Sequence, residues 1–441
     1  MGDDKTAPAF EVYDSGSKIP DALKARVLQI TVDDRVDQAA VAMIELSDEK
    51  NGVSGGSAFK VGNELKIELG YVGKTAVVFE GEITGSKGTY PRRGPATFTV
   101  VGMDKFHRLR RNRRVETFLQ MKDSDVASQV ASKAGLSCDA EATSVKLDYV
   151  LQQNQTDADF LLERAKLYGY EVWVDGKTLK FRKPKLDDGA SAKIKWHEQL
   201  KHLSTTISLL RAQEVKVSAW SMKDKKGIAH SAKKGDEQSL MGSTKAGNEV
   251  LAGKFGAPVL SRPFYPASTE DEVTEWSKGE FHERSQHFVT GHGMCSGDPK
   301  IGRGKVIEIE GIGDELSGGY YVHCAIHTLL PKSGYTTTFR VLKTAVKKGT
   351  PPPAKTAPPS QSSAQSSPPP PAPKQNLTFV ASNDGGAPLA GTPFLLRNPD
   401  GTTKTGSMPA DGKVQIKDAP AGSHTLELEH FGEPKISQDG D

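Results

Sequence analysis

The side chains best suited to hold a metal ion lie together in the second half of the sequence. Imidazole nitrogens and thiolates are the usual zinc ligands in proteins. Seven histidines and cysteines lie between residues 282 and 327: His282, His287, His292, Cys295, His323, Cys324 and His327. These residue types raise the hypothesis of a zinc hydrolase built on the histidine-rich stretch.

The spacing of four of these histidines argues against a shared zinc ion. His323 and His327 fall on a predicted strand, where four residues span about 13 Å at ~3.3 Å per residue. Each zinc–nitrogen bond is only about 2.1 Å long, so these two side chains cannot chelate one ion. His282 and His287 fall on a predicted helix, where five positions separate them by about 140°.

The three cysteines form neither a CxxC motif nor an even-numbered framework, which suits a protein made in a reducing cytoplasm. Cys324 alternates with Val322 and Ile326, which favours a buried thiol in the core. A composite metal site at His292 and Cys295 is an alternative that stays open. Apart from it, we expect neither a metal nor a cofactor.

No residue pattern predicts catalysis. The sequence contains neither the HExxH motif of zinc proteases nor the GxxxxGK[ST] motif that binds nucleotide phosphates. Asp33-Asp34 and Asp187-Asp188 are adjacent carboxylates. Neighbours on a strand point to opposite faces, so neither pair suits general acid–base work. We therefore expect no catalytic residue and no enzymatic activity.

Five arginines crowd the segment Arg108-Leu-Arg-Arg-Asn-Arg-Arg114. Such a run could neutralise the phosphates of passing DNA. No aromatic side chains are interleaved with it to stack on bases, so the sequence does not favour direct nucleic-acid binding. A solvated connector, or a subunit interface that pairs with acidic residues, is the preferred interpretation. Whether the segment lines a lumen or an interface is left open.

Length and composition set the scale of the fold. A chain of 441 residues is too long for one core, and we expect three or four domains. Its 44 Gly and 26 Pro favour many short strands, and a net charge of +3 indicates no nucleic-acid or membrane partner. We expect no signal peptide and no membrane span, because no stretch approaches roughly 18 apolar residues.

The elements that would position these side chains begin with a β region over residues 1–112. Asn63-Glu-Leu-Lys-Ile-Glu-Leu-Gly70 alternates apolar and polar residues, as a half-buried antiparallel strand does. The same pattern recurs between glycine-rich turns at 28–32, 77–83 and 98–100. This spacing predicts a first β-barrel.

Residues 113–190 predict an α/β insertion of two helices and a hairpin. Ser124 and Thr156 are suited to cap the two helices, and a glycine would end each of them. Asp175-Gly176 then lies between two β-prone runs. This pair is the strongest local signal for a hairpin, because a type I′ turn needs positive φ at two positions.

Strands return over residues 191–346, which predict a second β-barrel. A Lys- and Gly-rich interval at about 222–256 predicts a mobile insertion. Ser268 would cap a helix over about 268–288. Alternation predicts three closing strands at 304–310, 320–327 and 335–341.

A linker over residues 347–376 separates these regions from the last part of the chain. Ten of the 26 prolines lie between 351 and 373, and such a segment cannot bury enough surface to fold. As a polyproline II spacer it would reach about 70 Å. Residues 377–441 predict a small β-sandwich, an adaptor or cargo-binding module. The expected fold class is therefore mainly β with an α/β insertion: two β-barrels, a Pro-rich linker and a small C-terminal β-sandwich.

Three ordered stretches carry a family resemblance. The first is Asn154-Gln-Thr-Asp-Ala-Asp-Phe-Leu-Leu-Glu-Arg-Ala-Lys-Leu-Tyr-Gly-Tyr170, and the second is Arg108-Leu-Arg-Arg-Asn-Arg-Arg-Val-Glu-Thr-Phe118. The third runs from Phe288-Val-Thr-Gly-His-Gly through Asp298-Pro-Lys-Ile-Gly-Arg-Gly to Tyr335-Thr-Thr-Thr-Phe. Over residues 10–345, roughly, the chain resembles the phage late control gene D family. Relatives of that family include the hub half of type VI secretion VgrG spikes and the baseplate hubs of contractile tails.

The resemblance implies a structural homotrimer whose ring joins the inner tube, or a tube-initiator protein, to a spike or tip protein. Other baseplate components would be further partners. Such a protein would be assembled in the bacterial cytoplasm and reside in a phage tail or injection-system particle. Residues 377–441 are similar to a transthyretin or carboxypeptidase-regulatory module, where a cargo or effector would attach. A secreted protein that binds cell wall or polysaccharide is the alternative that stays open.

Overall fold

The structure of the chain, a computed structural model, divides into two compact units, Met1–Pro352 and Pro353–Asp441. No described helix is both long enough and apolar enough to cross a membrane. The described residues are 7–49, 52–208, 214–247, 249–250, 258–263, 267–347, 375–380, 388, 390–398, 402–419 and 425–428.

The first β region is built from strands in which buried apolar residues alternate with polar ones. In β5, Leu65, Ile67 and Leu69 are buried, so the alternation predicted over 63–70 is confirmed. The elements are β1 (Pro8–Asp14), β2 (Ser17–Lys18), α1 (Asp21–Lys24), β3 (Val27–Arg35), β4 (Val41–Ser47), β5 (Glu64–Tyr71), β6 (Lys74–Thr89), β7 (Thr97–Met103) and the 3₁₀ helix η2 (Lys105–Arg110).

The α/β insertion follows directly, and the hairpin predicted within it is confirmed. Asp175 pairs with Thr178 across Gly176, whose φ is +58°. The first helix begins at Asp123 after Lys122, so the prediction that Ser124 caps it is wrong. The elements are β8 (Arg113–Lys122), α2 (Asp123–Lys133), β9 (Ser137–Ala140), β10 (Lys146–Thr156), α3 (Asp157–Tyr168), β11 (Glu171–Asp175) and β12 (Thr178–Arg182).

Helix α3 has the two ends that its sequence predicts. Thr156 Oγ1 accepts a hydrogen bond from the Asp159 N–H at 3.1 Å, which satisfies a backbone donor of the first turn. Gly169 ends the helix at φ +65°. A glycine is required there for a second reason, because a Cβ would lie 2.8 Å from the Gly279 carbonyl oxygen of α5. The two helices therefore touch through their backbones.

The remaining elements of the first unit include a three-stranded sheet and a long helix. The elements are β13 (Ala192–Lys195), β14 (Leu200–Ile207), β15 (Glu214–Ser221), β16 (Lys226–Ala232), β17 (Lys245–Ala246), β18 (Val259–Arg262), α5 (Glu270–Gln286), β19 (Val289–Ser296), β20 (Val306–Glu310), β21 (Gly318–Leu330), β22 (Gly334–Lys343) and β23 (Ala345–Val346).

Two predictions for this part of the chain need correction. The interval 222–256 contains strand β16, which pairs with β15, so it is not a loop throughout. Residues 248 and 251–256 of that interval lie outside the described residues. Helix α5 is capped by Thr269, whose Oγ1 accepts from the Glu272 N–H at 3.3 Å, and not by Ser268.

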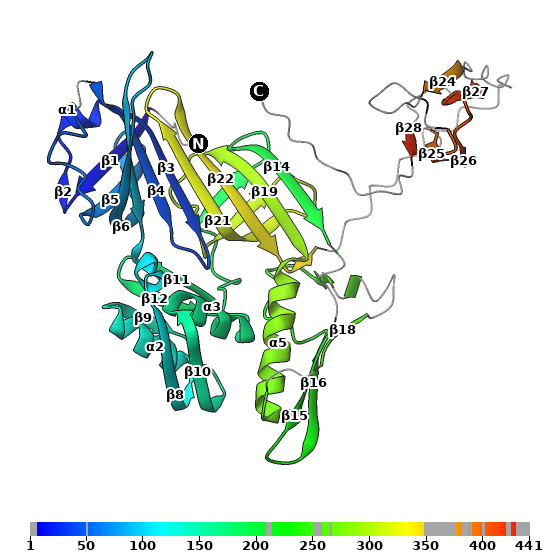
Figure 1. Cartoon of the computed structure of the whole chain (residues 1–441), viewed down its shortest axis with the longest axis horizontal. Helices are drawn as coiled ribbons and strands as arrows, with labels where there is room; N and C mark the ends of the chain where they lie inside the picture. Colours follow the sequence, from blue (N-terminus) through cyan, green and yellow to red (C-terminus); the bar gives the residue numbers. More distant parts are fainter. Residues whose placement is uncertain are drawn as a thin grey trace, which may run out of the picture. The chain divides into compact units, whose positions relative to one another are not determined.

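A continuous antiparallel sheet joins the two β regions, as Figure 1 shows. Strand β21 of the second region pairs with β3 of the first, with Thr328 opposite Thr31. The regions predicted as two barrels therefore share hydrogen bonds edge to edge, and the expectation of a mainly β fold with an α/β insertion is confirmed. The strand order along the sheet is β14-β19-β22-β21-β3-β4-β7-β6-β5-β1-β2.

Helix α5 and its sheet share a core with the α/β insertion. Val215, Val273 and Trp276 belong to the same buried cluster as Phe160 and Val172 of the insertion. Figure 1 draws α5, β15 and β16 on the side of the large sheet where the insertion lies. Segments predicted within the second barrel thus help to hold the insertion in place.

The described residues of the second unit form five short strands. They are β24 (Gln375–Val380), β25 (Pro393–Arg397), β26 (Thr403–Ser407), β27 (Lys413–Ala419) and β28 (Thr425–Leu428). β24 pairs with β27, and β25 pairs with both β26 and β28. Phe394, Leu396 and Met408 are its buried apolar residues. Of the linker predicted over residues 347–376, residues 348–374 lie outside the described residues, and its last two residues belong to β24.

Candidate functional site

The most heavily connected polar side chain of the described chain is Arg303, on the loop between β19 and β20. Its side chain is only 9% exposed. Gly304 follows at φ +70°, and a Cβ there would lie 3.2 Å from the Trp173 ring. The tight turn therefore lets the loop approach β11 and sends Arg303 inward.

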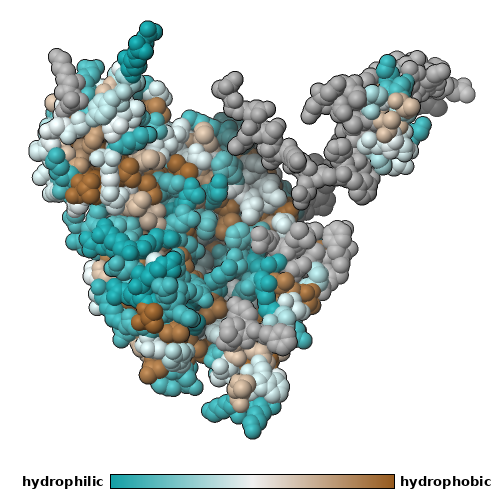
Figure 2. All heavy atoms as spheres, viewed as in Figure 1, coloured by the Kyte–Doolittle hydropathy of each residue, from teal (hydrophilic) through white to brown (hydrophobic). Residues whose placement is uncertain are grey.

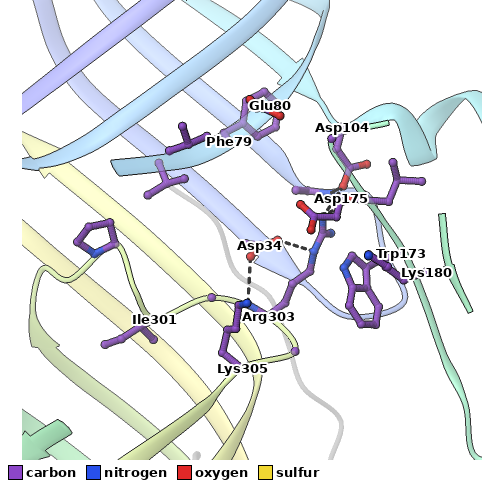
Figure 3. A pocket seen from close by; sticks show the side chains of 18 of the residues that line it. Asp34, Phe79, Glu80, Asp104, Trp173, Asp175, Lys180, Ile301, Arg303 and Lys305 are labelled. Carbon is purple, nitrogen blue, oxygen red and sulfur yellow. Dashed lines mark hydrogen bonds and ion pairs between the residues drawn. The ribbon is translucent and has the colours of Figure 1, made fainter. Parts of the chain in front are cut away.

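Two carboxylates from the first β region hold the Arg303 guanidinium. Arg303 Nε lies 2.8 Å from Asp34 Oδ1 of β3, and the Arg303 backbone N–H donates to Asp34 Oδ2 at 3.1 Å. Arg303 Nη2 donates to Asp104 Oδ2 at 2.9 Å, just after β7. Figure 3 shows the guanidinium between these carboxylates, with Asp175 and Trp173 beside it.

Backbone carbonyls complete the set of acceptors around the guanidinium. Arg303 Nη2 donates to the Val174 carbonyl of β11 at 2.6 Å. Arg303 Nη1 donates to the carbonyls of Arg35 and Gln38 at 3.2 and 3.3 Å. A guanidinium has five N–H donors, and the three carbonyls and two carboxylates offer one acceptor to each. Arg303 thus ties the second β region to the first and to the insertion.

Burial raises the pKa of Asp34 and of Asp104 above the ordinary value, although the charge of Arg303 opposes this rise. Burial opposes the charge of Arg303, but the attraction of Asp34 and Asp104 outweighs it and raises the guanidinium pKa above its ordinary value. With every donor paired, Arg303 has none left for a substrate. The geometry therefore fits a rigid junction between the first β region, the α/β insertion and the second β region.

A cavity of about 410 Å³ lies beside this junction. Both signs of charge line it. Lys180 donates to Asp139 at 2.9 Å, and the Arg182 guanidinium lies 4.9 Å from the centre of the Trp173 ring. Its described lining contains no serine, threonine or cysteine that could act as a nucleophile. His327 borders the cavity, but burial lowers its pKa to about 4.

Asp33 and Asp34 lie on β3 as the strand geometry predicts, but Asp187 and Asp188 lie in a turn between β12 and β13, so the strand expected there is wrong. On β3, Asp33 pairs with Arg35 at 2.6 Å, whereas Asp34 points the other way to Arg303. Asp188 lines the cavity and Asp187 accepts from Ser239. Neither pair brings two carboxylates to one reacting position.

The arginine-rich segment is paired with acidic residues of its own chain. Arg108 forms a bidentate pair with Glu82 of β6, and the pair lowers the Glu82 pKa to about 2 against the opposing effect of burial. Arg114 Nε lies 3.1 Å from Asp157, at the start of α3. Arg110 lies 3.6 Å from Asp159 in the same turn. The segment is thus a connector that fastens α3 to the first β region.

The histidines at 282–327 are dispersed. His282 Nε2 lies 2.6 Å from the Asp236 carbonyl oxygen, and His287 Nδ1 lies 2.9 Å from the Glu283 carbonyl oxygen. His327 is buried, with Nδ1 2.8 Å from the Tyr335 hydroxyl. No three His, Cys, Asp or Glu side chains in the described ranges converge in a way that could hold a metal ion.

The composite site at His292 and Cys295 does not form in β19. His292 is exposed and Cys295 is buried, because residues three apart on a strand face opposite sides. Cys324 is buried as predicted, but beside charged neighbours: its Sγ lies 3.9 Å from Asp33 Oδ1. Burial raises the pKa of this thiol to about 11.

Two features of the chain were not predicted from its sequence. Gly52-Val-Ser-Gly-Gly56 matches the GxSxG pattern of serine hydrolases, which needs a strand-to-helix turn at the serine. Here Ser54 lies in turns between β4 and β5, and its N–H donates to Asp48 Oδ1 at 3.3 Å. Arg303 lies between two glycines in one of the family-like stretches, but no local pattern marks it as the centre of a junction.

Two solved structures share the fold of this chain. The 43 kDa tail protein of prophage MuSo2 from Shewanella oneidensis has a TM-score of 0.58 at 12% identity, and the match covers 76% of this chain and 98% of that protein. The tail protein from Neisseria meningitidis MC58 has a TM-score of 0.57 at 12% identity and covers 76% and 97%. The chain therefore has the fold of these two tail proteins.

Among curated proteins, none matches the sequence. The tail-protein fold agrees with the broad resemblance to tail and hub proteins, while the finer assignment to the late control gene D family stays a prediction. Residues 4–330 match the family model described as the Alg8 N-terminal domain, which covers well over half of the 441 residues. The chain belongs to the Alg8 N-terminal domain family.

Proposed function

We propose that this chain is a structural hub subunit in the baseplate of a contractile phage tail or a related injection system. In this proposal three copies form a ring that joins the inner tube to the spike. The observation that carries it is the continuous sheet from β14 to β2, which runs through both β regions of one subunit. The likeness to two tail proteins supports the same reading.

The edge of this sheet supports ring formation. β14 pairs with β19 on one side, and no described strand pairs with its other side. An eight-residue edge leaves backbone donors and acceptors free to pair with another chain. Identical copies arranged in a closed ring would cover such edges.

The junction around Arg303 suits a part that transmits force. A sheath-driven tail would load the hub, and a hub whose regions shifted under load would lose the alignment of tube and spike. Arg303 fastens β3, β11 and the loop after β19 with hydrogen bonds in a buried site. Buried charge-assisted hydrogen bonds are among the stronger polar contacts in proteins.

The outer surface of the insertion supports a role inside an assembly. Val115 and Leu119 of β8 are 75% and 62% exposed, and Tyr149 of β10, opposite Leu119, is 57% exposed. Figure 2 shows brown, apolar patches on a largely hydrophilic surface where Figure 1 draws β8 and β10. Contiguous exposed apolar residues are typical of proteins that work with partners.

We further propose that the chain catalyses no reaction and that its C-terminal module is tethered by the linker. The arginine and carboxylate side chains of the junction are engaged with one another. A proline-rich linker would leave residues 377–441 free to hold a tip protein, a cargo or an effector at a distance. The mature protein would reside in the particle, with other baseplate components as neighbours.

The oligomeric state tests the hub proposal. Light scattering of the purified full chain at micromolar concentration is expected to give three times the mass of one chain. Ile207→Lys places a charge at the end of β14, where Ile207 is 43% exposed, and is expected to yield monomer. Val61→Lys is the matched control, because Val61 is 65% exposed in a turn before β5. A wild-type chain that is a stable monomer at this concentration would contradict the proposal.

A further inference from the structure

Strands β6 and β7 continue into a hairpin that extends beyond their pairing with the rest of the sheet. The register of β6 with β5 ends at Glu82, so Thr84–Thr89 pair with β7 alone among the described strands. Every residue from 86 to 95 is exposed. Figure 1 draws this hairpin as a projection of the first β region. Residues 84–96 are called the arm below.

The arm carries three positive charges and no negative charge. From Ile83 to Met103 the sequence contains Lys87, Arg92 and Arg93 but neither Asp nor Glu. The net charge of the whole chain is also +3, so the charges of all its other residues sum to zero. Within the described part of the chain, the charged groups of these three side chains form no ion pair or hydrogen bond. The positive charge of the arm is therefore available to a partner.

The arginine-rich segment 108–114 differs from the arm in this respect. Its Arg108, Arg110 and Arg114 lie against carboxylates of their own chain. The expectation that the chain does not bind nucleic acid depended on that segment and on the net charge, and neither of them describes the arm. Unpaired cations on an exposed hairpin, with no carboxylate among them, attract a partner that carries many negative charges.

An aromatic ring lies beside these cations. Tyr90 is 61% exposed, and its ring lies close against the backbone of Gly88, where a Cβ would be 2.7 Å from Tyr90 Cε2 and Oη. Only a glycine leaves room for the ring at this position. Pro91 and Pro95 flank the two arginines of the turn and restrict its backbone. The turn thus presents an exposed ring and two guanidinium groups on a restricted backbone.

We propose that the arm binds single-stranded nucleic acid, with Lys87, Arg92 and Arg93 against the phosphates and the Tyr90 ring stacked on a base. A single strand supplies both the negative charges and the stacking partner. An acidic protein surface would match the charges but not the ring, and the bases of a duplex are already stacked on one another. Because every base has a face on which a ring can stack, binding does not depend on sequence. The arm belongs to one chain, so the site is independent of the hub proposal.

Fluorescence anisotropy of the full chain tests the site with a labelled oligothymidine of about 20 nucleotides as the probe. We expect binding in the micromolar range at low salt. The logarithm of the association constant should fall against the logarithm of the salt concentration with a slope of about −2, because each of three phosphate contacts on a single strand contributes about −0.7.

Variants separate the two kinds of contact. The double variant Arg92→Ala/Arg93→Ala is expected to bind at least tenfold more weakly at low salt, and its slope falls to about −0.7 because one cation remains. Tyr90→Ala is expected to weaken binding roughly fivefold or more with the slope unchanged, whereas Tyr90→Phe keeps the ring and the affinity. All of these positions are exposed, so the melting temperature should stay that of the wild type.

The double variant Lys216→Ala/Lys223→Ala is the matched control, because it removes two exposed cations of β15 and the turn that follows it. It is expected to keep the wild-type affinity and slope. If the two double variants weaken binding equally, or if the wild type does not bind oligothymidine at low salt, the proposal is wrong. Tighter binding of a duplex of the same length, or of polyglutamate, would also overturn it and would assign the arm to a duplex or to an acidic protein surface.

Discussion

Arg303 donates from Nη2 to Asp104 Oδ2 at 2.9 Å, although the two residues are 199 positions apart in the sequence. The same guanidinium lies 2.8 Å from Asp34 Oδ1, which comes from another strand of the first β region. One side chain therefore sets the position of a loop of the second region against the first. The junction depends on a fully paired buried cation, which makes its removal easy to detect.

Replacement of Arg303 is expected to destabilise the first unit. Arg303→Met leaves the buried Asp34 and Asp104 without a cation, and removal of one partner from a buried ion pair costs about 3–5 kcal/mol. Arg303→Lys keeps the charge but offers fewer donors in another geometry. We therefore expect its free energy of unfolding to lie between those of the wild type and Arg303→Met. Urea unfolding followed by circular dichroism measures both. Arg93→Met, at an exposed loop residue, is the control, and an equal effect of the two Met variants would contradict the role of Arg303.

Gly279→Ala is expected to destabilise the contact between α3 and α5. Alanine improves helix propensity by roughly 1 kcal/mol, so the variant would be stabilising if space allowed. The added Cβ would instead lie 2.2 Å from the Leu167 carbonyl oxygen and 2.7 Å from Tyr168 Cα, both backbone atoms. Overpacking of this kind costs about 1–3 kcal/mol, and the backbones would have to separate.

The melting temperature of Gly279→Ala shows whether the gain in helix propensity or the cost of the steric clash is larger. Gly227→Ala on β16 is the control, since a Cβ there meets nothing within 4 Å. A Gly279→Ala variant as stable as the wild type would show that α3 and α5 can move apart without cost.

Local chemistry was enough to predict the elements whose ends depend on adjacent residues. Thr156 caps α3, and Asp175-Gly176 lies at the turn of the β11–β12 hairpin; both depend on neighbours within three positions. The sequence therefore predicted the start of α3 and the hairpin correctly. The start of α2 was missed because Asp123 is held from afar, by Arg164 at 2.6 Å and Tyr168 at 2.8 Å. Local capping rules favour Ser124, but this tertiary ion pair sets the helix start.

The junction around Arg303 could not be predicted for the same reason. Arg303, Asp34 and Asp104 lie on three segments, and only the sheet pairing between β3 and β21 brings those segments together. The alternation of apolar residues predicts that strands exist, but it does not say which strands pair. The composite site at His292 and Cys295, which the sequence left open, is decided by a single strand, because β19 turns the two side chains to opposite faces.

Stability is expected to fall as pH rises from about 6.5 to 8. Glu171 has a pKa near 8 in the folded chain because of burial, against an ordinary value of 4.5. Between these values the folded state binds more protons than the unfolded state. Each unit by which the pH rises therefore lowers the free energy of unfolding by on the order of 1 kcal/mol. His323 and His327, whose pKa values are lowered to about 4, destabilise the fold only below pH 6.5. Asp37, whose pKa burial raises to about 6, and Lys343, whose pKa burial lowers to about 8, titrate at the two ends of this window, so the contribution of Glu171 is obtained from the difference between the wild type and Glu171→Gln.

Urea unfolding at several pH values across this window measures the slope for the wild type and for Glu171→Gln. The variant cannot ionise at this position, so its free energy of unfolding is expected to fall less steeply with pH than that of the wild type. A wild-type slope that persists in Glu171→Gln would assign the effect to another group.

Deletion of residues 351–441 is expected to leave ring assembly intact. The sheet edge at β14 and the junction at Arg303 both lie in the unit Met1–Pro352, and every described strand of the large sheet belongs to that unit. Light scattering of the truncated chain should therefore give the same number of subunits as the full chain. In a pull-down from purified particles, the truncated ring should lose only the partner or cargo held by the C-terminal module. A truncated chain that is monomeric while the full chain is trimeric would instead make the tether part of the ring.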